Sequence, residues 1–344
     1  MEREEALSYF LHQNHGAVPT FLYDTSLCSA VTGISTADIF RDNSYDPDLA
    51  AKAIAGSMSY LGHDMSVGSL KTVDYRVFGS EMRYKDNAPM MTVKRAFEDP
   101  TELYRHTPEE SDCQSQHAYA KSIPKIRELK PDAIIAGTVP APFSVGCMLR
   151  GLEPMLMDVM SEPDYVRELL AFAGQMCSII GDIMITEGDP DFGIITGAFD
   201  NPDLIHLDSI RELCLPGVKR QFRIIDECHI PKVYHPHGHL TKGIGLELLD
   251  DYQKIGFDCL YYGENNEHSL MRDLCSDRFS LMGGVDTFTT IYIGDDDRVV
   301  TDTHDVLTAM KGIPFVFSCS CSVDGDLDVR KMKMMIDTVR SFSD

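Results

Sequence analysis

Short apolar runs alternate with longer amphipathic segments along most of this chain. Apolar runs bounded by polar turns are typical of strands that are buried on both faces of a parallel sheet. We predict eight such strands, at residues 18–23, 63–67, 132–139, 192–196, 231–235, 257–262, 279–282 and 314–318. They are spread over nearly the whole chain, which argues for one continuous sheet.

Helical spacing fills most of the segments between these runs. We expect helices at residues 47–61, 142–150, 161–186, 207–228, 241–255, 268–275, 302–311 and 327–342. Ser161 is expected to be the N-cap of its helix, with Pro163 in the first turn, where a proline is tolerated. Alternating strands and helices call for a parallel sheet. The pattern therefore predicts an α/β fold, a (β/α)8 or TIM barrel, with a single domain over residues 1–344.

Three segments depart from this alternation. The residues before the first strand predict a helical lead-in at the N-terminus. Between residues 70 and 95 the pattern becomes that of a polar hairpin, with turn signals at Gly79 and Asp86-Asn87. We interpret this hairpin as an insertion over the top of the sheet. Asp200-Asn201-Pro202 is expected to form a turn.

The carboxyl ends of the predicted strands carry the candidate functional side chains. In a (β/α)8 barrel, active sites are built at these ends. In chain order the ends carry Asp24, Asp64, Thr138, Thr196, His235, His237, Glu264, Asp286, Cys319 and Cys321. The strand assignment alone predicts that the site is drawn from this set.

The segment Tyr234-His235-Pro236-His237-Gly238-His239 holds three imidazoles within five residues. Alternate side chains of a strand point the same way, so His235 and His237 can face one point. Two neutral imidazoles at this spacing are good zinc ligands, and the thiolate of Cys319 or Cys321 is a candidate third. Three ligands leave one coordination position open, which is typical of catalytic rather than structural zinc.

The composition is that of an acidic globular protein. The chain has 344 residues, of which 43% are hydrophobic, a net charge of −23 and a pI near 4.8. An acidic surface disfavours binding to nucleic acid and to anionic membranes. No uninterrupted apolar run approaches the ~20 residues that a membrane-spanning helix needs. We therefore expect neither a nucleic-acid partner nor a membrane partner.

Ten cysteines occur without a secretory signal at the N-terminus. The opening Met1-Glu2-Arg3-Glu4-Glu5 is too polar for such a signal. Free thiols persist in a reducing compartment, so we expect the protein to be cytoplasmic. Most of the cysteines are expected to be small buried apolar side chains, and only Cys319 and Cys321 form a close cluster.

Several short motifs, in this order, resemble the uroporphyrinogen decarboxylase superfamily over nearly the whole chain. They are Arg3-Glu4-Glu5-Ala6-Leu7 followed by Val18-Pro19, Ala141-Pro142-Phe143-Ser144 with Arg150-Gly151 and Glu153, Leu215-Pro216, Gly283-Gly284-Val285-Asp286 and the late cysteine loop. No single motif is specific, and their order and spacing together carry the resemblance. The fold that it implies is again a (β/α)8 barrel.

The resemblance implies one of two chemistries. Decarboxylases of the superfamily bind a four-ring tetrapyrrole and need an N-terminal arginine pair, whereas Arg41 stands alone after the first predicted strand. In the corrinoid-dependent methyltransferases, a His-x-Cys-Gly segment and a late cysteine hold zinc. His235-Pro236-His237-Gly238 resembles that segment, with His237 in the place of the cysteine. The register of the last strand makes Cys321 the better match to the late cysteine and Cys319 the fallback.

The resemblance therefore implies a zinc-dependent methyltransferase that works with a corrinoid (cobalamin) cofactor on a partner protein. One thiolate and two imidazoles make a less electron-rich zinc than two thiolates and one imidazole, which favours Lewis-acid activation of an ether oxygen. We favour transfer of a methyl group from a methoxylated aromatic to cobalt, the first step of an O-demethylase system. The alternatives are transfer from a methyl-corrinoid protein to a thiol of the coenzyme M type, uroporphyrinogen-type decarboxylation, and a non-catalytic barrel that delivers corrinoid or substrate.

Four acidic side chains at the strand ends complete the predicted site. Glu264 and Asp286 are candidates to supply an acid or to orient a ligand. Asp24 and Asp64 are weaker candidates for the same wall, where the corrinoid cofactor would bind. Two alternatives stay open: Asp286 as a helix N-cap, and Glu264 as a polar loop residue. His239 is expected to lie outside the ligand set.

Overall fold

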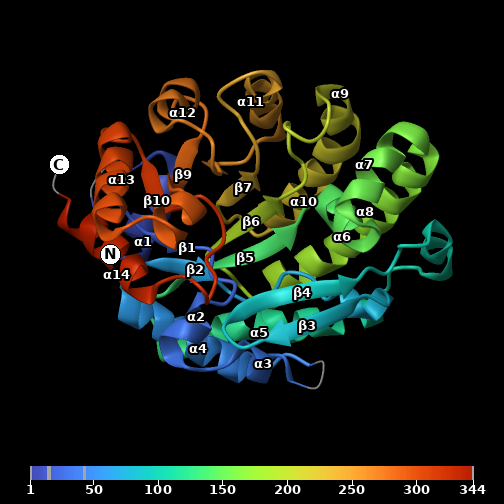
Figure 1. Ribbon diagram of the computed structural model, residues 1–344, viewed down its shortest axis with the longest axis horizontal. Helices are drawn as coiled ribbons and strands as arrows, with labels where there is room; N and C mark the ends of the chain where they lie inside the picture. The colour runs from blue at the N-terminus through green and yellow to red at the C-terminus, as the bar shows by residue number, and fades with distance from the viewer. Residues whose placement is uncertain (1, 14–16, 42–43, 343–344) are drawn as a thin grey trace.

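Eight parallel strands form a nearly closed barrel in the computed structural model, which describes residues 2–13, 17–41 and 44–342 (Figure 1). The strands are β1 (Phe21–Leu22), β2 (Met65–Val67), β5 (Ile134–Pro140), β6 (Phe192–Gly197), β7 (Lys232–Pro236), β8 (Cys259–Tyr261), β9 (Ser280–Val285) and β10 (Phe315–Cys319), paired in that order. The first and last strands meet where the N–H of Phe317 donates to the carbonyl of Pro19 over 2.8 Å. The predicted (β/α)8 barrel is confirmed.

Helices cover the outside of the barrel in the expected alternation. The predicted helices are present as α4 (Pro47–Leu61), α6 (Pro142–Arg150), α8 (Pro163–Thr186), α9 (Leu207–Ser209) with η6 (Ile210–Cys214) and α10 (Leu215–Glu227), α11 (Ile244–Ile255), α12 (His268–Cys275), α13 (Asp296–Ala309) and α14 (Val329–Ser341). The structure adds α2 (Leu27–Thr32), α3 (Thr36–Ile39), α5 (Gln114–Leu129), α7 (Leu152–Ser161), η3 (Tyr75–Phe78), η4 (Pro100–Arg105), η5 (Glu110–Cys113) and η7 (Thr287–Tyr292).

Ser161 does not cap the long helix α8, contrary to the prediction. It is the last residue of α7, and its hydroxyl donates to the carbonyl of Met157 over 3.1 Å. The cap position of α8 is Glu162, whose side chain makes no capping bond. The residues before Ser161 are themselves helical, so the serine hydroxyl bonds back to the preceding turn instead of forward.

The amino end of the barrel is closed by the predicted helical lead-in, α1 (Arg3–Ser8) and η1 (Tyr9–Leu11). Its Tyr9 and Phe10 are buried with the inward-facing side chains of the strands. The ring of Phe10 lies 4.8 Å from that of Phe192, the first residue of β6. The opposite face, at the carboxyl ends of the strands, is left to form the site.

The insertion near residues 70–95 is a hairpin of β3 (Glu81–Lys85) and β4 (Ala88–Lys94). Its turn at Asp86-Asn87 places Asn87 in the left-handed region, at φ 52°. The carbonyl of Asn87 packs so closely on Gly325 that a Cβ there would lie 2.3 Å from the oxygen. Because Gly325 belongs to the loop after β10, the hairpin reaches the carboxyl face of the barrel, as predicted.

Helix α8 is long and apolar enough to cross a membrane, but it is a core helix. In its most apolar window, 61% of the residue surface is buried inside the protein. It packs against α5, α6, α7 and α10 and against β5. Its apolar residues therefore supply the layer between the barrel and the outer helices.

Candidate metal centre

His235 lies at the carboxyl end of β7, where the neighbouring strand fixes its ring. Its Nδ1–H donates to the carbonyl of Tyr261 over 2.9 Å, and the two rings stack with centroids 3.9 Å apart. This bond holds the proton on Nδ1 and leaves Nε2 with a lone pair. Nε2 is buried and has no hydrogen-bond partner among the described residues. A buried acceptor without a partner is costly, and a metal ion would satisfy it.

His237 follows β7 by one residue and faces the same point as His235, as the His-x-His spacing predicts. Its Nε2 lies 3.6 Å from Sγ of Cys321, and its Nδ1 lies 3.4 Å from Oε1 of Glu264. The rings of His235 and His237 are 4.7 Å apart. One nitrogen of His237 is therefore held by a carboxylate while the other points to the thiol.

Cys321, not Cys319, brings the sulfur to this point. Cys319 is the last residue of β10 and is fully buried, with Sγ 3.7 Å from Sδ of Met335 in α14. Cys319 therefore points outward, toward α14. Side chains two residues apart on a strand point the same way, so Cys321 would also point outward if β10 continued to it. The chain leaves the strand after Cys319, and the N–H of Cys321 donates to Oγ1 of Thr287 over 3.3 Å. The fallback assignment of Cys319 does not fit this geometry.

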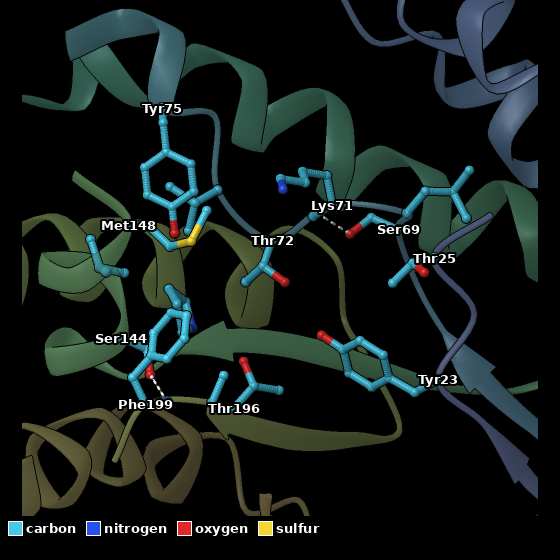
Figure 2. A pocket seen from close by; sticks show the side chains of 15 residues that line it. Tyr23, Thr25, Ser69, Lys71, Thr72, Tyr75, Ser144, Met148, Thr196 and Phe199 are labelled. Carbon is cyan, nitrogen blue, oxygen red and sulfur yellow. Dashed lines mark hydrogen bonds between the residues drawn. The ribbon is translucent and has the colours of Figure 1, made fainter. Parts of the chain in front are cut away.

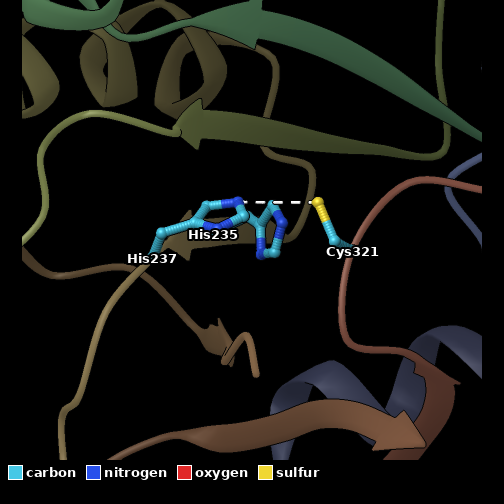
Figure 3. Close-up of side chains that lie close together, drawn as sticks. All are labelled: His235, His237 and Cys321. Carbon is cyan, nitrogen blue, oxygen red and sulfur yellow. Dashed lines mark hydrogen bonds between the residues drawn. The ribbon is translucent and has the colours of Figure 1, made fainter. Parts of the chain in front are cut away.

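The three side chains converge on one point (Figure 3). Their ligand atoms lie within 4.8 Å of one another. Two ligands at a tetrahedral angle around zinc, with bonds of about 2.0–2.3 Å, lie about 3.5 Å apart. The 3.6 Å between His237 and Cys321 already matches this spacing. Two imidazole nitrogens and a thiolate form a ligand set that fits zinc. One of these nitrogens, Nε2 of His235, is buried and unpaired among the described residues.

The charges of the site favour the anionic form of the sulfur. Burial raises the pKa of the Cys321 thiol, but the imidazoles of His235 and His237 outweigh it and lower the pKa to about 5. Burial lowers the pKa of His237, whereas its contacts with Cys321 and Glu264 raise it to about 10. The hydrogen bond with His237 lowers the pKa of Glu264 to about 2. A thiolate is the form of cysteine that binds metals.

Glu264 follows β8. Of the three candidate ligands, its carboxylate contacts only His237. A carboxylate that holds the second nitrogen of a metal-binding histidine fixes the orientation of the ring and strengthens it as a ligand. Of the two roles predicted for Glu264, the contact supports the orienting one. His239 lies outside the ligand set, with Nδ1 2.7 Å from Oδ2 of Asp203.

Asp286 caps a helix in this structure. Its Oδ1 accepts hydrogen bonds from the backbone N–H groups of Phe288 and Thr289, at 2.9 and 2.6 Å, in the first turn of η7. This is the alternative that the sequence left open. The cap accounts for the presence of an aspartate here, and a role in catalysis stays a prediction.

Asp64 does not lie at the carboxyl end of a strand, where the sequence placed it, whereas Asp24 does. Asp64 precedes the first residue of β2, at the amino end of the barrel, where it accepts from Thr20 and pairs with Arg340. Asp24 does follow β1, but it is fully buried and accepts from the N–H of Cys28 in α2. Asp64 lies at the amino end of the predicted strand at 63–67 as well as of β2, so its placement among the carboxyl ends was wrong. Alternation after β1 turns Asp24 away from the mouth.

Tyr23 is a site residue that the sequence analysis missed. Its ring lies 6.3 Å from that of His235, and it also lines a cavity of about 260 Å³ at the mouth of the barrel (Figure 2). None of the three candidate ligands lines this cavity, so Tyr23 lies between it and the metal site. Burial raises the pKa of Tyr23. Its position at the end of an apolar run made it indistinguishable from a core residue.

Asp200, expected only to form a turn, is a buried carboxyl group beside the cavity. It accepts a hydrogen bond from Oγ of Ser144 over 3.0 Å, and Ser144 lines the cavity. Its second oxygen is buried and has no partner among the described residues. Burial raises the pKa of Asp200 to about 7. Burial cannot be read from a turn motif, which explains why the sequence did not single it out.

Comparisons with known proteins agree with this fold. A sequence model of the family described as uroporphyrinogen decarboxylase (URO-D) matches residues 2–342. A structure named methyltransferase from Methanosarcina mazei superposes with a TM-score of 0.81 at 19% identity, covering 98% of each chain. A B12-independent methionine synthase from Shewanella sp. W3-18-1, in complex with selenomethionine, has a TM-score of 0.55 at 12% identity and covers 94% of this chain and 96% of its own. At these identities the two structures show the fold alone. No curated protein sequence matches the chain.

Proposed function

This chain belongs to the uroporphyrinogen decarboxylase family, and within that family we propose that it is a metal-dependent methyltransferase. The methyl group would move between a small donor and the cobalt of a corrinoid on a partner protein. The observation that carries the proposal is the convergence of His235, His237 and Cys321 at the carboxyl end of the barrel. The likeness in fold to a protein named as a methyltransferase supports it.

The residues around the site fit a zinc ion that takes part in the reaction. A zinc ion bound by the two imidazoles and the thiolate would have an open position, where it can act as a Lewis acid on an ether oxygen. The carbonyl of Tyr261 and the carboxylate of Glu264 hold the two rings in place for that purpose. With a pKa of about 2, Glu264 is ionised at neutral pH, so it orients and does not supply the proton.

We favour a methoxylated aromatic as the methyl donor. In that reaction the bond between the methyl carbon and the ether oxygen breaks, and the carbon bonds to the reduced cobalt of the corrinoid, which supplies the electron pair. The oxygen keeps the pair from the broken bond and takes a proton from solvent water to become a phenol. Tyr23 keeps its own proton because burial raises its pKa, and it lies between the cavity and His235. We assign to Tyr23 the hydrogen bond to the departing oxygen.

A corrinoid protein needs access to the mouth, and the rim beside Cys321 is suited to binding a protein. Phe288, Tyr292 and Ile293, in and after η7, are 60%, 48% and 60% exposed. The same helix contacts the cysteine loop, since Oγ1 of Thr287 accepts from the N–H of Cys321. Exposed apolar groups of this size are typical of protein-binding surfaces. We assign this apolar rim, Phe288 with Tyr292 and Ile293, to the corrinoid protein.

The cavity argues against a tetrapyrrole as substrate. Its volume of about 260 Å³ suits a small molecule, because pockets for drug-sized ligands span about 300–1,000 Å³. A tetrapyrrole carries several carboxylates, whereas Lys71 is the one cationic side chain among the described residues that line the cavity. Arg41, the lone arginine after β1, is exposed and pairs with Asp38. Uroporphyrinogen-type decarboxylation is therefore the weaker proposal.

The test is methyl transfer to free cobalamin. Zinc-loaded protein is incubated with reduced cobalamin and methoxyphenols, with and without a ring carboxylate, and methylcobalamin is followed by its absorbance. We expect methylcobalamin with the native protein and with Cys319→Ala, and a loss of at least about 100-fold with Cys321→Ala, in line with removal of an essential catalytic group. If methylcobalamin is instead consumed when a thiol is added, the enzyme works in the thiol direction and the aromatic donor is wrong. No transfer in either direction would contradict the proposal as a whole.

A further inference from the structure

The cavity beside Tyr23 is built from five parts of the barrel mouth. Its lining comes from the residues after β1, residues 69–75, the end of β5, helix α6, and the end of β6 with the residues after it. Thr196, in this lining, is the register partner of His235 on the neighbouring strand. The cavity therefore opens next to the metal site and not at a remote position.

One positive charge faces this cavity without a countercharge of its own. Figure 2 shows Lys71 with its side chain among the lining residues, above Thr72 and beside Tyr75. Its Nζ lies 5.9 Å from the ring centroid of Tyr75 and makes no hydrogen bond or ion pair within residues 2–13, 17–41 and 44–342. Burial lowers the pKa of Lys71 to about 8 despite the opposing charge of Asp74.

Asp74 does not neutralise this lysine. Its Oδ1 accepts from Nε of Arg76 over 2.7 Å, and its Oδ2 accepts from Oγ of Ser115 over 2.8 Å. Both oxygens are thus engaged by other side chains. A charged amine held in a partly buried cavity without a paired anion is unfavourable, and an anionic ligand would relieve the cost.

The rest of the lining suits a flat apolar body. Tyr75, Met148 and Phe199 lie on the same side of the cavity in Figure 2, and Val145 also lines it. Aromatic and thioether side chains are typical partners of an aromatic ring. The volume of about 260 Å³ is sufficient for one substituted ring.

We infer that this cavity binds a single-ring aromatic acid and that Lys71 pairs with its carboxylate. The inference rests on the proposed function and narrows it, from methoxylated aromatics in general to methoxybenzoates. Lys71 is thus a specificity-determining residue, and the ring carboxylate is what separates a good methyl donor from a poor one.

The test is a calorimetric titration with a matched pair of ligands, 4-methoxybenzoate and its neutral analogue 4-methoxybenzamide. The native protein, Lys71→Met and Lys219→Met are compared, since Lys219→Met removes the same charge from the exposed face of α10. We expect the native protein and Lys219→Met to bind the benzoate at least about tenfold more tightly than the benzamide, as one charge-assisted pair allows. Lys71→Met should bind both ligands with the same affinity. Lys71→Arg should keep part of the preference for the anion.

The inference is overturned if the native protein binds the two ligands equally, or if it binds neither. It is also overturned if Lys71→Met keeps the preference for the benzoate. A third ligand, 2-mercaptoethanesulfonate, separates a carboxylate on a ring from an anionic thiol. If it alone binds and needs Lys71, the aromatic class is wrong. The proposed function is judged apart from binding, by methylcobalamin formation with the same preparations. Lys71-dependent binding without methyl transfer would leave this inference standing and remove the proposed function.

Discussion

At the scale of single residues, the site depends on what holds the second nitrogen of each histidine. His235 is held by a backbone carbonyl that no side-chain substitution removes, whereas His237 is held by the carboxylate of Glu264. Glu264 is therefore the position at which the metal site can be weakened without touching a ligand.

Replacing Glu264 with alanine should lower zinc affinity about 10- to 100-fold, because the His237 ring loses its orientation and its basicity. A competition titration against a coloured chelator measures this. Glu267→Ala is the matched control, since its carboxylate accepts from Ser269 and does not reach the histidines. Unchanged affinity in Glu264→Ala would show that the contact with His237 has no bearing on the metal.

His63 gives a prediction about stability that is independent of the metal. Both of its ring nitrogens are buried without partners among the described residues, and burial lowers its pKa from 6.5 to about 3. The unfolded chain binds this proton near pH 6.5 but the folded chain does not, so stability is lost as pH falls below that value. Between pH 7 and pH 5 the loss from this group is about 2 kcal/mol.

Urea unfolding at the two pH values tests this expectation. Between pH 7 and pH 5 the free energy of unfolding should fall in both proteins. The fall should be about 2 kcal/mol smaller in His63→Leu than in the native protein. His304→Leu, on the exposed side of α13, should keep the native dependence. Parallel curves for the native protein and His63→Leu would mean that His63 is protonated in the folded state.

At the scale of elements, the connection between β9 and α13 sets the position of the cysteine loop. Asp286 caps η7, and Thr287 at its start binds the backbone of Cys321. The capping role and the catalytic role proposed for Asp286 make opposite predictions, because serine can replace a cap but cannot replace a carboxylate acid.

We predict that Asp286→Ser keeps methyl transfer within about threefold of the native rate, while Asp286→Ala loses about 1 kcal/mol of stability, the usual value of a cap. Steady-state rates and urea unfolding of both variants decide the matter. A large loss of kcat in Asp286→Ser with native stability would restore the catalytic assignment.

Helices whose ends carry clear sequence signals could be predicted with the right bounds. Helices without such signals could not. Helices α4, α6 and α12 have the predicted bounds, since proline, glycine or a polar turn marks their ends. Helix α5 carries Pro124 in its interior and was missed, because a proline normally interrupts a helix. Helix α13 begins at Asp296, six residues before the expected Asp302, because Asp295 is its N-cap within a run of aspartates that resembled a loop.

The residues of the candidate site likewise divide into those that the sequence could predict and those that it could not. The spacing of His235 and His237 is a local property of a strand, so their shared direction could be predicted. Lys71 faces the cavity through a loop conformation that no local pattern fixes, and Tyr23 ends an apolar run as a core residue would, so both were missed. Asp64 was misplaced because it was counted among the carboxyl ends, although it lies at the amino end of the predicted strand at 63–67 as well as of β2.

At the scale of the whole molecule, the amino end of the barrel is filled by the N-terminal helices, whereas the carboxyl end carries the candidate site. The cavity lies on the side of β1, β5 and β6, and the apolar rim lies after β9, with the metal site between them. In the proposed function, the small donor and the corrinoid protein therefore approach from different sides.

Replacing Phe288 with serine should therefore weaken the reaction with the corrinoid protein and leave the reaction with free cobalamin unchanged. We expect KM for the corrinoid protein to rise about tenfold, as for the loss of one apolar contact residue of an interface. Tyr104→Ser, at an exposed aromatic residue of η4, is the control. Equal effects on both acceptors would place Phe288 in the chemistry and not in docking.

The most direct test of the metal site is the zinc content of purified protein, measured by elemental analysis for the native chain, Cys321→Ala and Cys319→Ala. The two cysteines are two residues apart, but only one faces the histidines. The account predicts about one zinc per chain in the native protein and in Cys319→Ala, and strongly reduced zinc in Cys321→Ala, because a three-ligand site does not survive the loss of its thiolate. Equal zinc in all three proteins, or full activity of a native chain that holds no metal, would contradict it.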